Sequence, residues 1–243
     1  MKRLLLFFLL VAFMAPDASA QGVIIPPTTK PTKPTKPTKP TKPTKPTTSL
    51  PSYKTCPDGN HPHLIDLGLP SGTKWAFCNV DASKPEDYGG YYAWGETTMK
   101  SGEYSWKTYR HCDGTENSCH NLGSSICGTQ YDVAHVKWGG NWQMPTEDQF
   151  KELLHKCNKV VWTTQNGVEG RMFTGPNGRS IFLPAAGYRG SSFDNAGSDG
   201  DYWSGAQSTS DARCAYELDF DSGGAYWYGT GRYCGQSVRP VSR

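Results

Sequence analysis

Residues 145–157 read PTEDQFKELLHKC, and this stretch predicts the most regular element of the chain. Thr146 and Gln149 have the spacing of a capping box, in which each side chain bonds to the backbone N–H of the other at a helix N-terminus. The apolar residues that follow recur at the spacing of one helix face: Phe150, Leu153, Leu154 and Cys157. We therefore predict a helix here that packs one side against a core.

Short β-like runs follow this helix and alternate with turn signals such as Asn166-Gly167 and Pro176-Asn177-Gly178. Residues Asp132–Val136 predict a second, short helix. The predicted strands are Val160–Thr164, Arg171–Thr174, Ser180–Leu183 and Ser237–Val241. The fold class expected from these elements is α+β, mostly irregular and β, with one or two helices.

The first 20 residues have the pattern of a secretory signal peptide. Lys2 and Arg3 precede an apolar run from Leu4 to Met14, and Ala18-Ser19-Ala20 supplies small residues for cleavage. The apolar run is too short for a permanent membrane anchor. We predict export, with the mature protein periplasmic, on the cell surface or secreted, and without a transmembrane segment.

Residues 21–52 predict a linker, because the triplet Thr-Lys-Pro occurs six times between Thr29 and Pro46. Proline at every third position removes backbone donors and prevents both helix and sheet. An extended polyproline chain of this length spans about 55 Å. The linker is therefore either a stalk or a solvated spacer, and residues 53–243 form the folded domain.

The formal charge of +3 comes from the N-terminal segments. The signal peptide carries +1 and the linker lysines carry +6, so residues 53–243 carry −4. A nucleic-acid-binding domain would need a basic face. We predict no nucleic-acid partner.

All eight cysteines follow the linker, and export permits disulfides. Cys112, Cys119 and Cys127 lie near His111 and His120, but their spacing differs from the Cys-x-x-Cys hooks of zinc sites. Disulfides within this loop are the favoured interpretation, with zinc as the alternative. The remaining cysteines are Cys56, Cys78, Cys157, Cys214 and Cys234.

The C-terminal stretch 201–243 carries the strongest indication of function. Within Ala215–Asp221 the residues alternate: one side of a strand would carry Tyr216, Leu218 and Phe220, and the other Glu217, Asp219 and Asp221. We expect the first side to be buried and the second to be solvated. Tyrosines among Gly, Ser and Thr follow, which is the composition of a binding surface or of an ordinary Gly-rich hairpin.

Many separate motifs resemble the Fibrobacter succinogenes major paralogous domain family, exported proteins of Bacteroidetes and their relatives. They begin with Asp66–Ala76, Cys78–Val80, Pro85–Gly89 and Ala93–Thr97. They continue with Tyr131–Val136, Trp138–Gly140, Met144–Thr146, Thr163–Val168, Leu183–Arg189, Tyr202–Ser204 and Ser237–Val241. The likeness covers essentially all of residues 64–241.

That family is similar to the C-type lectin-like fold, in the branch shared with formylglycine-generating enzymes. The shared mark is the segment Trp142–Glu147 that leads into the helix. The resemblance implies small twisted antiparallel sheets with one or two helices and long loops. It also implies adjacent chain termini and a ligand-facing surface built from the C-terminal strands and loops.

Family members commonly carry an Asn-rich C-terminal run, and this chain keeps its frame while replacing the Asn positions. The frame residues are Ala215, Tyr216, Leu218, Phe220, Trp227, Arg232, Tyr233 and Gly235. The replaced positions are Cys214, Glu217, Asp219, Asp221, Gly224, Tyr226, Tyr228, Gly229, Thr230, Gly231 and Cys234. Most replacements are reachable from an Asn codon by changing adenines alone, with Glu217 as the exception.

Adenine substitution in a 3′ repeat is how diversity-generating retroelements vary their target proteins, whose variable regions also lie on C-type lectin-like folds. The resemblance therefore implies a hypervariable binding protein, with ordinary surface drift as the alternative. Cys214 and Cys234 are then either a disulfide private to this variant or two unpaired residues. Cys78 and Cys157 are the better candidates for a structural role.

Other function classes have weaker support. The six histidines are scattered and none joins a nucleophile motif, so we predict no enzyme and no cofactor. An oxygen-rich set suggests either Ca²⁺ or, as we prefer, a turn with Asx bonds: Asp194, Asn195, Asp199 and Asp201. The Glu-Pro-Asn and Trp-Asn-Asp motifs of calcium-dependent lectins do not occur.

The function expected is an exported, stalked ligand-binding module without a bound metal. Its partner would be a protein or glycan on a cell, phage or host surface. The predicted ligand-binding residues are Glu217, Asp219, Asp221, Tyr226, Trp227, Tyr228, Thr230, Tyr233 and Gln236. The alternatives are a passive component of the cell envelope and a formylglycine-generating-type enzyme.

Overall fold

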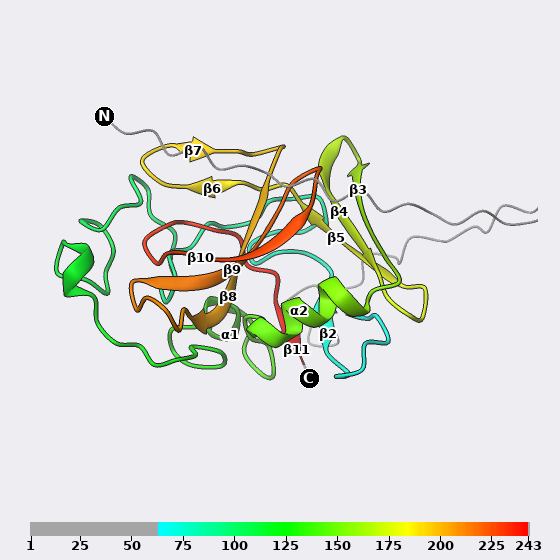
Figure 1. The fold of residues 1–243 in the computed structure, drawn as a ribbon, viewed down its shortest axis with the longest axis horizontal. Helices are drawn as coiled ribbons and strands as arrows, with labels where there is room; N and C mark the ends of the chain where they lie inside the picture. Colours follow the sequence, from blue (N-terminus) through cyan, green and yellow to red (C-terminus); the bar gives the residue numbers. More distant parts are fainter. Residues whose placement is uncertain (1–62, 243) are drawn as a thin grey trace, which may run out of the picture. The chain divides into compact units, whose positions relative to one another are not determined.

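The computed structural model describes residues 63–242 (Figure 1). The predicted signal peptide, the linker and Cys56 lie outside the described residues. The described chain forms three sheets of three strands and one sheet of two, all of them antiparallel. Two α-helices and one short 3₁₀ helix, η1 (Glu116–Ser118), accompany them in this part of the chain. The α+β class and the small antiparallel sheets are confirmed.

Helix α2 (Glu147–Lys156) begins where the capping box predicts. Thr146 Oγ1 accepts from the Gln149 N–H at 3.2 Å, and Gln149 Oε1 accepts from the Thr146 N–H at 2.8 Å. Phe150 and Leu153 are fully buried, as the predicted apolar face requires. The helix ends at Lys156, and Cys157 is its C-cap.

Helix α1 (Val133–Trp138) confirms the second helix and extends it beyond the prediction. Its N-cap is Asp132, whose carboxylate accepts from the N–H groups of Ala134 and His135 at 2.9 and 3.0 Å. The same carboxylate accepts from Met144 N at 2.8 Å. One buried side chain therefore starts this helix and fixes the segment that leads into α2.

Three of the predicted strands form one meander, β3 (Lys159–Gln165), β4 (Val168–Thr174) and β5 (Ser180–Pro184). Asn166 and Gly167 connect the first two with φ values of 50° and 86°. Positive φ at both central residues is the requirement of a tight hairpin turn, which the Asn-Gly pair meets. These three strand predictions are confirmed.

A second meander carries the C-terminal stretch: β8 (Gly200–Gln207), β9 (Cys214–Phe220) and β10 (Ala225–Gly231), in the order β10-β9-β8. Helix α2 crosses one side of this sheet in Figure 1 and contacts β8 and β9. Strands β10 and β8 form the two edges of this sheet, but the residues of β8 are mostly buried whereas those of β10 are half-buried or exposed.

The two ends of the described chain meet in the third sheet, where β1 (Leu64–Asp66) and β11 (Val241–Ser242) both pair with β2 (Lys74–Ala76). The prediction of a strand over Ser237–Val241 is wrong for most of its length. Before Val241 the segment makes isolated bridges, such as Tyr202 with Ser237, because Pro240 has no N–H to donate to a ladder. The two-stranded sheet is β6 (Tyr188–Arg189) with β7 (Phe193–Asp194).

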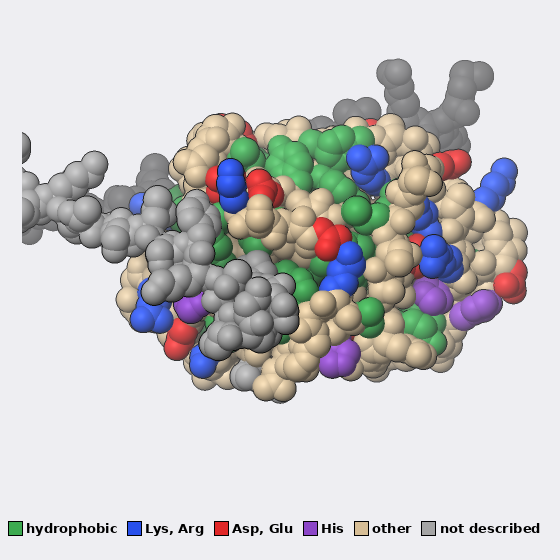
Figure 2. Space-filling view, turned by 180° about the vertical axis from the view of Figure 1, so that it is seen from behind, with side chains coloured by type: hydrophobic (Ala, Val, Ile, Leu, Met, Phe, Trp, Pro, Cys, Tyr) green, Lys and Arg blue, Asp and Glu red, His purple; other side chains and the backbone are tan. Residues whose placement is uncertain are grey.

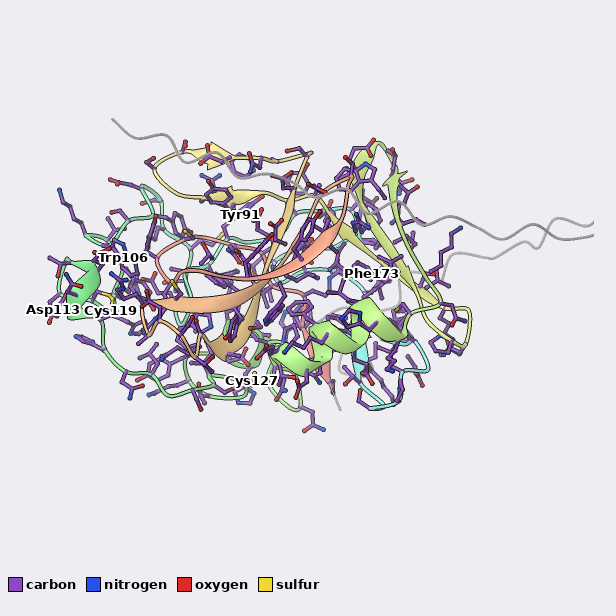
Figure 3. All side chains as sticks on the ribbon, in the orientation of Figure 1. Tyr91, Trp106, Asp113, Cys119, Cys127 and Phe173 are labelled. Carbon is purple, nitrogen blue, oxygen red and sulfur yellow. A yellow bond between two sulfur atoms is a disulfide. The ribbon has the colours of Figure 1, made fainter. Side chains whose placement is uncertain are left out.

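Arg239 holds this last segment in the interior, where it is fully buried. Its Nε donates to Asn79 Oδ1 at 2.8 Å, and its Nη atoms donate to the carbonyl oxygens of Ala76, Phe77 and Phe182 at 2.8 to 3.1 Å. Nearby, the main core contains Phe150, Phe173 and Phe220, of which Phe173 is labelled in Figure 3. A charged residue of the C-terminal motif thus has a packing role.

The cysteines confirm the loop disulfide and not the zinc alternative. Cys112 and Cys119 are disulfide-bonded, whereas Cys127 has a free thiol. Cys214 and Cys234 are free as well, so the private disulfide considered for them is not formed. Cys78 and Cys157 are also free, and any structural role they have is one of packing.

Helix length and surface charge are two further properties that bear on possible partners. No helix within residues 63–242 combines the length and the apolarity needed to cross a membrane. Figure 2 shows the face opposite to that of Figure 1, where the described acidic and basic side chains are interspersed without a large patch of one sign.

Candidate functional site

The hairpin of β9 and β10 is closed by a turn in which Asp221 takes part through its side chain and its backbone. Its Oδ1 accepts from Gly223 N and Gly224 N at 2.7 and 2.8 Å. Its carbonyl oxygen accepts from Arg171 Nε and Nη2 at 3.0 and 2.7 Å. The predicted ligand residue Asp221 therefore shapes the hairpin, and one of its carboxylate oxygens already has partners.

The register of the hairpin divides the predicted site residues between two faces. Tyr226 is opposite Asp219, and Tyr228 is opposite Glu217, so these four side chains share one face. Trp227 is opposite Leu218 and belongs to the other face. We call the first group, Glu217, Asp219, Tyr226 and Tyr228, the hairpin face.

Tyr226 and Tyr228 are the exposed part of the hairpin face. Their side chains are 44% and 51% exposed, in an edge strand where neither is needed for the core. The two rings stack on each other with centroids 5.9 Å apart and planes at 27°. The pair is a flat, amphipathic surface of the kind that antibody-like binding sites use.

Trp227 faces inward and packs against the main core. Its ring stacks on Tyr216 at 5.3 Å and contacts Phe150 of α2 at 6.0 Å. The position of Trp227 therefore does not support the prediction that it binds ligand. It does support the assignment of Trp227 to the frame.

Glu217 corrects the expectation that the second side of β9 is solvated, because its side chain is only 7% exposed. Both faces of β9 are covered at this point: Leu218 lies in the main core, and Ala215 lies with Trp203 in a second core cluster. Gln236, itself buried, donates from Nε2 to the Glu217 carboxylate. Glu217 and Gln236 thus lie beneath the surface, although both were predicted as contact residues.

Asp219 is half-buried and meets Asp201 of β8 in the cross-strand register. Burial raises the pKa of Asp201 to about 7, and the charges of Asp219 and Asp199 add to the shift. Burial also raises the pKa of Glu217 to about 8, with the charge of Asp201 as a further cause. The hairpin face therefore has a group of coupled carboxylates behind its tyrosines.

The last two predicted residues lie toward the other end of β10. Thr230 is half-buried and opposite Ala215. Tyr233 follows the strand and packs on Trp106, with ring centroids 4.7 Å apart. Tyr233 therefore connects the end of the hairpin to the loop that contains Trp106.

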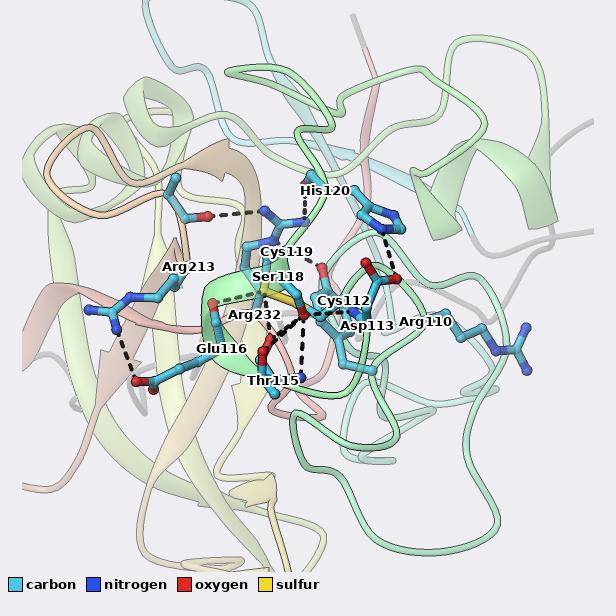
Figure 4. The surroundings of a disulfide bond; sticks show 12 residues. Arg110, Cys112, Asp113, Thr115, Glu116, Ser118, Cys119, His120, Arg213 and Arg232 are labelled. Atoms are coloured by element: carbon cyan, nitrogen blue, oxygen red, sulfur yellow. Dashed lines mark hydrogen bonds and ion pairs between the residues drawn. A yellow bond between two sulfur atoms is a disulfide. The ribbon is translucent and has the colours of Figure 1, made fainter.

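Arg232 fixes this end of the hairpin to the disulfide loop (Figure 4). Its guanidinium is buried and donates to the Tyr109 hydroxyl, the Ala212 carbonyl and the His120 carbonyl, each at 3.0 Å. His120 directly follows the disulfide-bonded Cys119. The loop stapled by this disulfide thus supports the hairpin from outside the sheet.

Sequence patterns did not predict Asp201 as a neighbour of this site, since it was considered with the possible calcium ligands. Within residues 63–242 no group of three or more His, Cys, Asp or Glu side chains is arranged to hold a metal ion. Asp194 accepts from Ser192 Oγ at 2.7 Å, and Asn195 has a φ of 61°, as in a tight turn. This turn is closed by the Asn195 carbonyl oxygen, which accepts from Ser198 N and Asp199 N at 3.0 and 2.9 Å, and not by the Asx side-chain bond that was predicted.

Comparisons with family models, with curated proteins and with solved structures find no match to this chain. The motifs quoted above are therefore the support for the family resemblance.

Proposed function

We propose that this chain is an exported, stalked binding module, and that its contact surface is the hairpin face of β9 and β10. The observation that carries the proposal is the stacked, exposed pair Tyr226 and Tyr228, held on an edge strand whose other face is packed into the core. Exposed aromatic pairs contribute large contact area at low conformational cost, which suits recognition of a protein or a glycan.

The proposal includes a C-type lectin-like fold and a retroelement-diversified C-terminus. The burial pattern supports the division into frame and contact positions along β10, although the replaced positions Glu217 and Cys234 are buried. Frame residues Ala215, Leu218 and Phe220 are fully buried, while the replaced positions Tyr226 and Tyr228 are exposed. Such a hairpin can change its contact chemistry with little effect on its packing.

The direct test is selection of ligands on the protein itself. The full chain is screened against a displayed random-peptide library and a glycan array, in parallel with the double variant Tyr226→Ala/Tyr228→Ala. The matched control is Met99→Ala/Val136→Ala, which also removes two exposed apolar side chains but lies outside the hairpin. Thermal unfolding verifies that all three proteins are folded.

We expect ligands that bind the wild type and the control with the same affinity and bind the tyrosine variant at least about tenfold more weakly. A folded tyrosine variant that binds every selected ligand as the wild type does would refute the assignment of the surface.

A further inference from the structure

The two carboxylates of the hairpin face, Glu217 and Asp219, and the neighbouring Asp201 of β8 lack a cationic partner among the described residues. Asp201 and Asp219 are directly opposite each other in β8 and β9, and Glu217 lies two residues before Asp219 on the same side. Like charges in such a pair repel one another. None of the three forms an ion pair with another described residue.

Two buried oxygen atoms in this group also lack a hydrogen-bond donor among the described residues: Asp201 Oδ2 and Gln236 Oε1. Asp201 is 8% exposed and Gln236 is 1% exposed. The Gln236 amide is part of the group, since its Nε2 donates to Glu217. Buried polar atoms without a partner are rare in folded proteins, so both acceptors still need a donor and the group has more acceptors than donors.

The neighbouring side chains do not supply that donor. Arg171 reaches this end of the sheet, but its guanidinium donates to the Asp221 carbonyl. The other titratable groups that interact with Asp201 or Glu217 are all acids, and none is a cation: Asp199, Asp219, Tyr91, Tyr188, Tyr202, Cys214 and Cys234. The tyrosines and thiols are neutral near pH 7, so any net charge here is negative, comes from the carboxylates, and grows as Asp201 and Glu217 lose their protons.

The exposed side chains of Tyr226 and Tyr228 lie beside these carboxylates. Tyr226 is the cross-strand neighbour of Asp219, and Tyr228 is that of Glu217. Aromatic ring faces attract cations, and they pack well against the aliphatic stems of Lys and Arg. A carboxylate beside two rings is thus a combination suited to a long basic side chain.

We propose that the hairpin face binds a single Lys or Arg side chain of a partner protein. The cationic head donates to Asp219, the half-exposed carboxylate, and Asp201 and Glu217 stabilise its charge from behind. The aliphatic stem lies on Tyr226 and Tyr228. The inference rests on the proposed function, because it names the chemistry of the ligand for that same surface.

The test uses four capped tripeptides, Ac-Gly-Xaa-Gly-NH₂ with Arg, Lys, Leu or Glu in the centre, titrated into the ¹⁵N-labelled full chain. We expect the Arg and Lys peptides to shift the backbone amides of Asp219 and Tyr226 with saturable curves, and the Leu and Glu peptides to leave them unchanged. Binding should weaken with added salt, and it should tighten between pH 6 and pH 8.5 as Asp201 and Glu217 lose protons.

The variant Asp219→Asn should weaken the binding of the Arg peptide about tenfold. The control Asp148→Asn makes the same charge change at an exposed position of α2 and should have no effect. Equal binding of all four peptides, the absence of shifts with Arg and Lys, or wild-type affinity in Asp219→Asn would each overturn the inference.

The two proposals can fail separately. A selected ligand that needs Tyr226 and Tyr228 but binds Asp219→Asn normally would preserve the binding surface and refute the basic ligand. A ligand that needs Asp219 but not the tyrosines would refute the tyrosine surface and retain the charge requirement.

Discussion

Asp201 of β8 and Asp219 of β9 are cross-strand partners, so two carboxylates stand directly opposite each other in the sheet that carries the proposed contact surface. Asp201 is buried and Asp219 is half-buried. Burial raises the pKa of both, and it raises the pKa of their neighbour Glu217. Ionisation of these groups therefore lowers the free energy of unfolding, and the size of this effect depends on pH.

We predict that the free energy of unfolding falls as pH rises from about 4 to about 8, because this group of carboxyls ionises. Asp201 has a folded pKa of about 7 against 3.8 ordinarily, so the folded state binds more protons than the unfolded state within that range. The stabilisation is complete below the unfolded pKa and is lost as pH approaches the folded one. Asp201→Asn should raise the melting temperature at pH 8.5, by the equivalent of about 4 kcal/mol, and change it little at pH 4.

The measurement is thermal unfolding of wild type and Asp201→Asn at both pH values, with Asp148→Asn as the control for removal of an exposed carboxylate. Equal effects of Asp201→Asn at pH 4 and pH 8.5 would show that folding does not raise the pKa of Asp201 and would contradict the prediction.

Two glycines of the same sheet should respond differently to Ala. A Cβ at Gly200 would lie 2.1 Å from the Phe220 ring, whereas a Cβ at Gly229 would meet Ser208 at an ordinary 3.5 Å. We expect Gly200→Ala to cost about 2 kcal/mol or more of unfolding free energy and Gly229→Ala to cost less than about 0.5. Denaturant unfolding measures both, and equal losses would contradict the close packing of the Phe220 ring on Gly200.

Arg239 should be essential for packing despite its charge. Arg239→Met would leave Asn79 Oδ1 and the carbonyl oxygens of Ala76, Phe77 and Phe182 without this donor. We expect a loss of about 3 to 5 kcal/mol. Arg110→Met, at an exposed position, is the control and should be close to neutral. Denaturant unfolding tests this, and a near-neutral Arg239→Met would mean that these acceptors find other donors.

The thiols should separate into three classes in alkylation experiments followed by mass spectrometry. Cys112 and Cys119 should react only after reduction. Cys78 and Cys234 should react slowly in the native state, because burial raises the pKa of each to about 12. The half-buried Cys214 should react faster, and rapid labelling of Cys78 would contradict its burial.

Local signals in the sequence predicted local structure well. Thr146 with Gln149 and Asn166 with Gly167 act through hydrogen bonds and backbone angles within a few residues, so their outcome depends little on the rest of the fold. Tyr226 and Tyr228 were predicted from composition and from the family resemblance, and the same reasoning also chose Trp227, which the alternation of β10 turns inward.

Contacts between distant segments could not be predicted in the same way. Alternation in β9 indicated a solvated side, but Gln236 covers Glu217 from nineteen positions further along the chain. Arg232 likewise bonds to Tyr109 and His120, which flank the disulfide loop Cys112–Cys119, and no spacing in the sequence reveals these contacts. The pairing of Asp201 with Asp219 needed the strand register as well.

Deep sequencing of the 3′ end of the gene across a cell population, with its flanking DNA, tests most directly whether contact residues vary over an invariant frame. We predict adenine-templated substitutions at the codons of the exposed and half-exposed positions Tyr226, Tyr228, Gly229 and Thr230, with Leu218, Phe220 and Arg239 unchanged. An invariant near-copy and a reverse transcriptase gene should lie nearby. A uniform 3′ end without a second copy would contradict diversification of this surface.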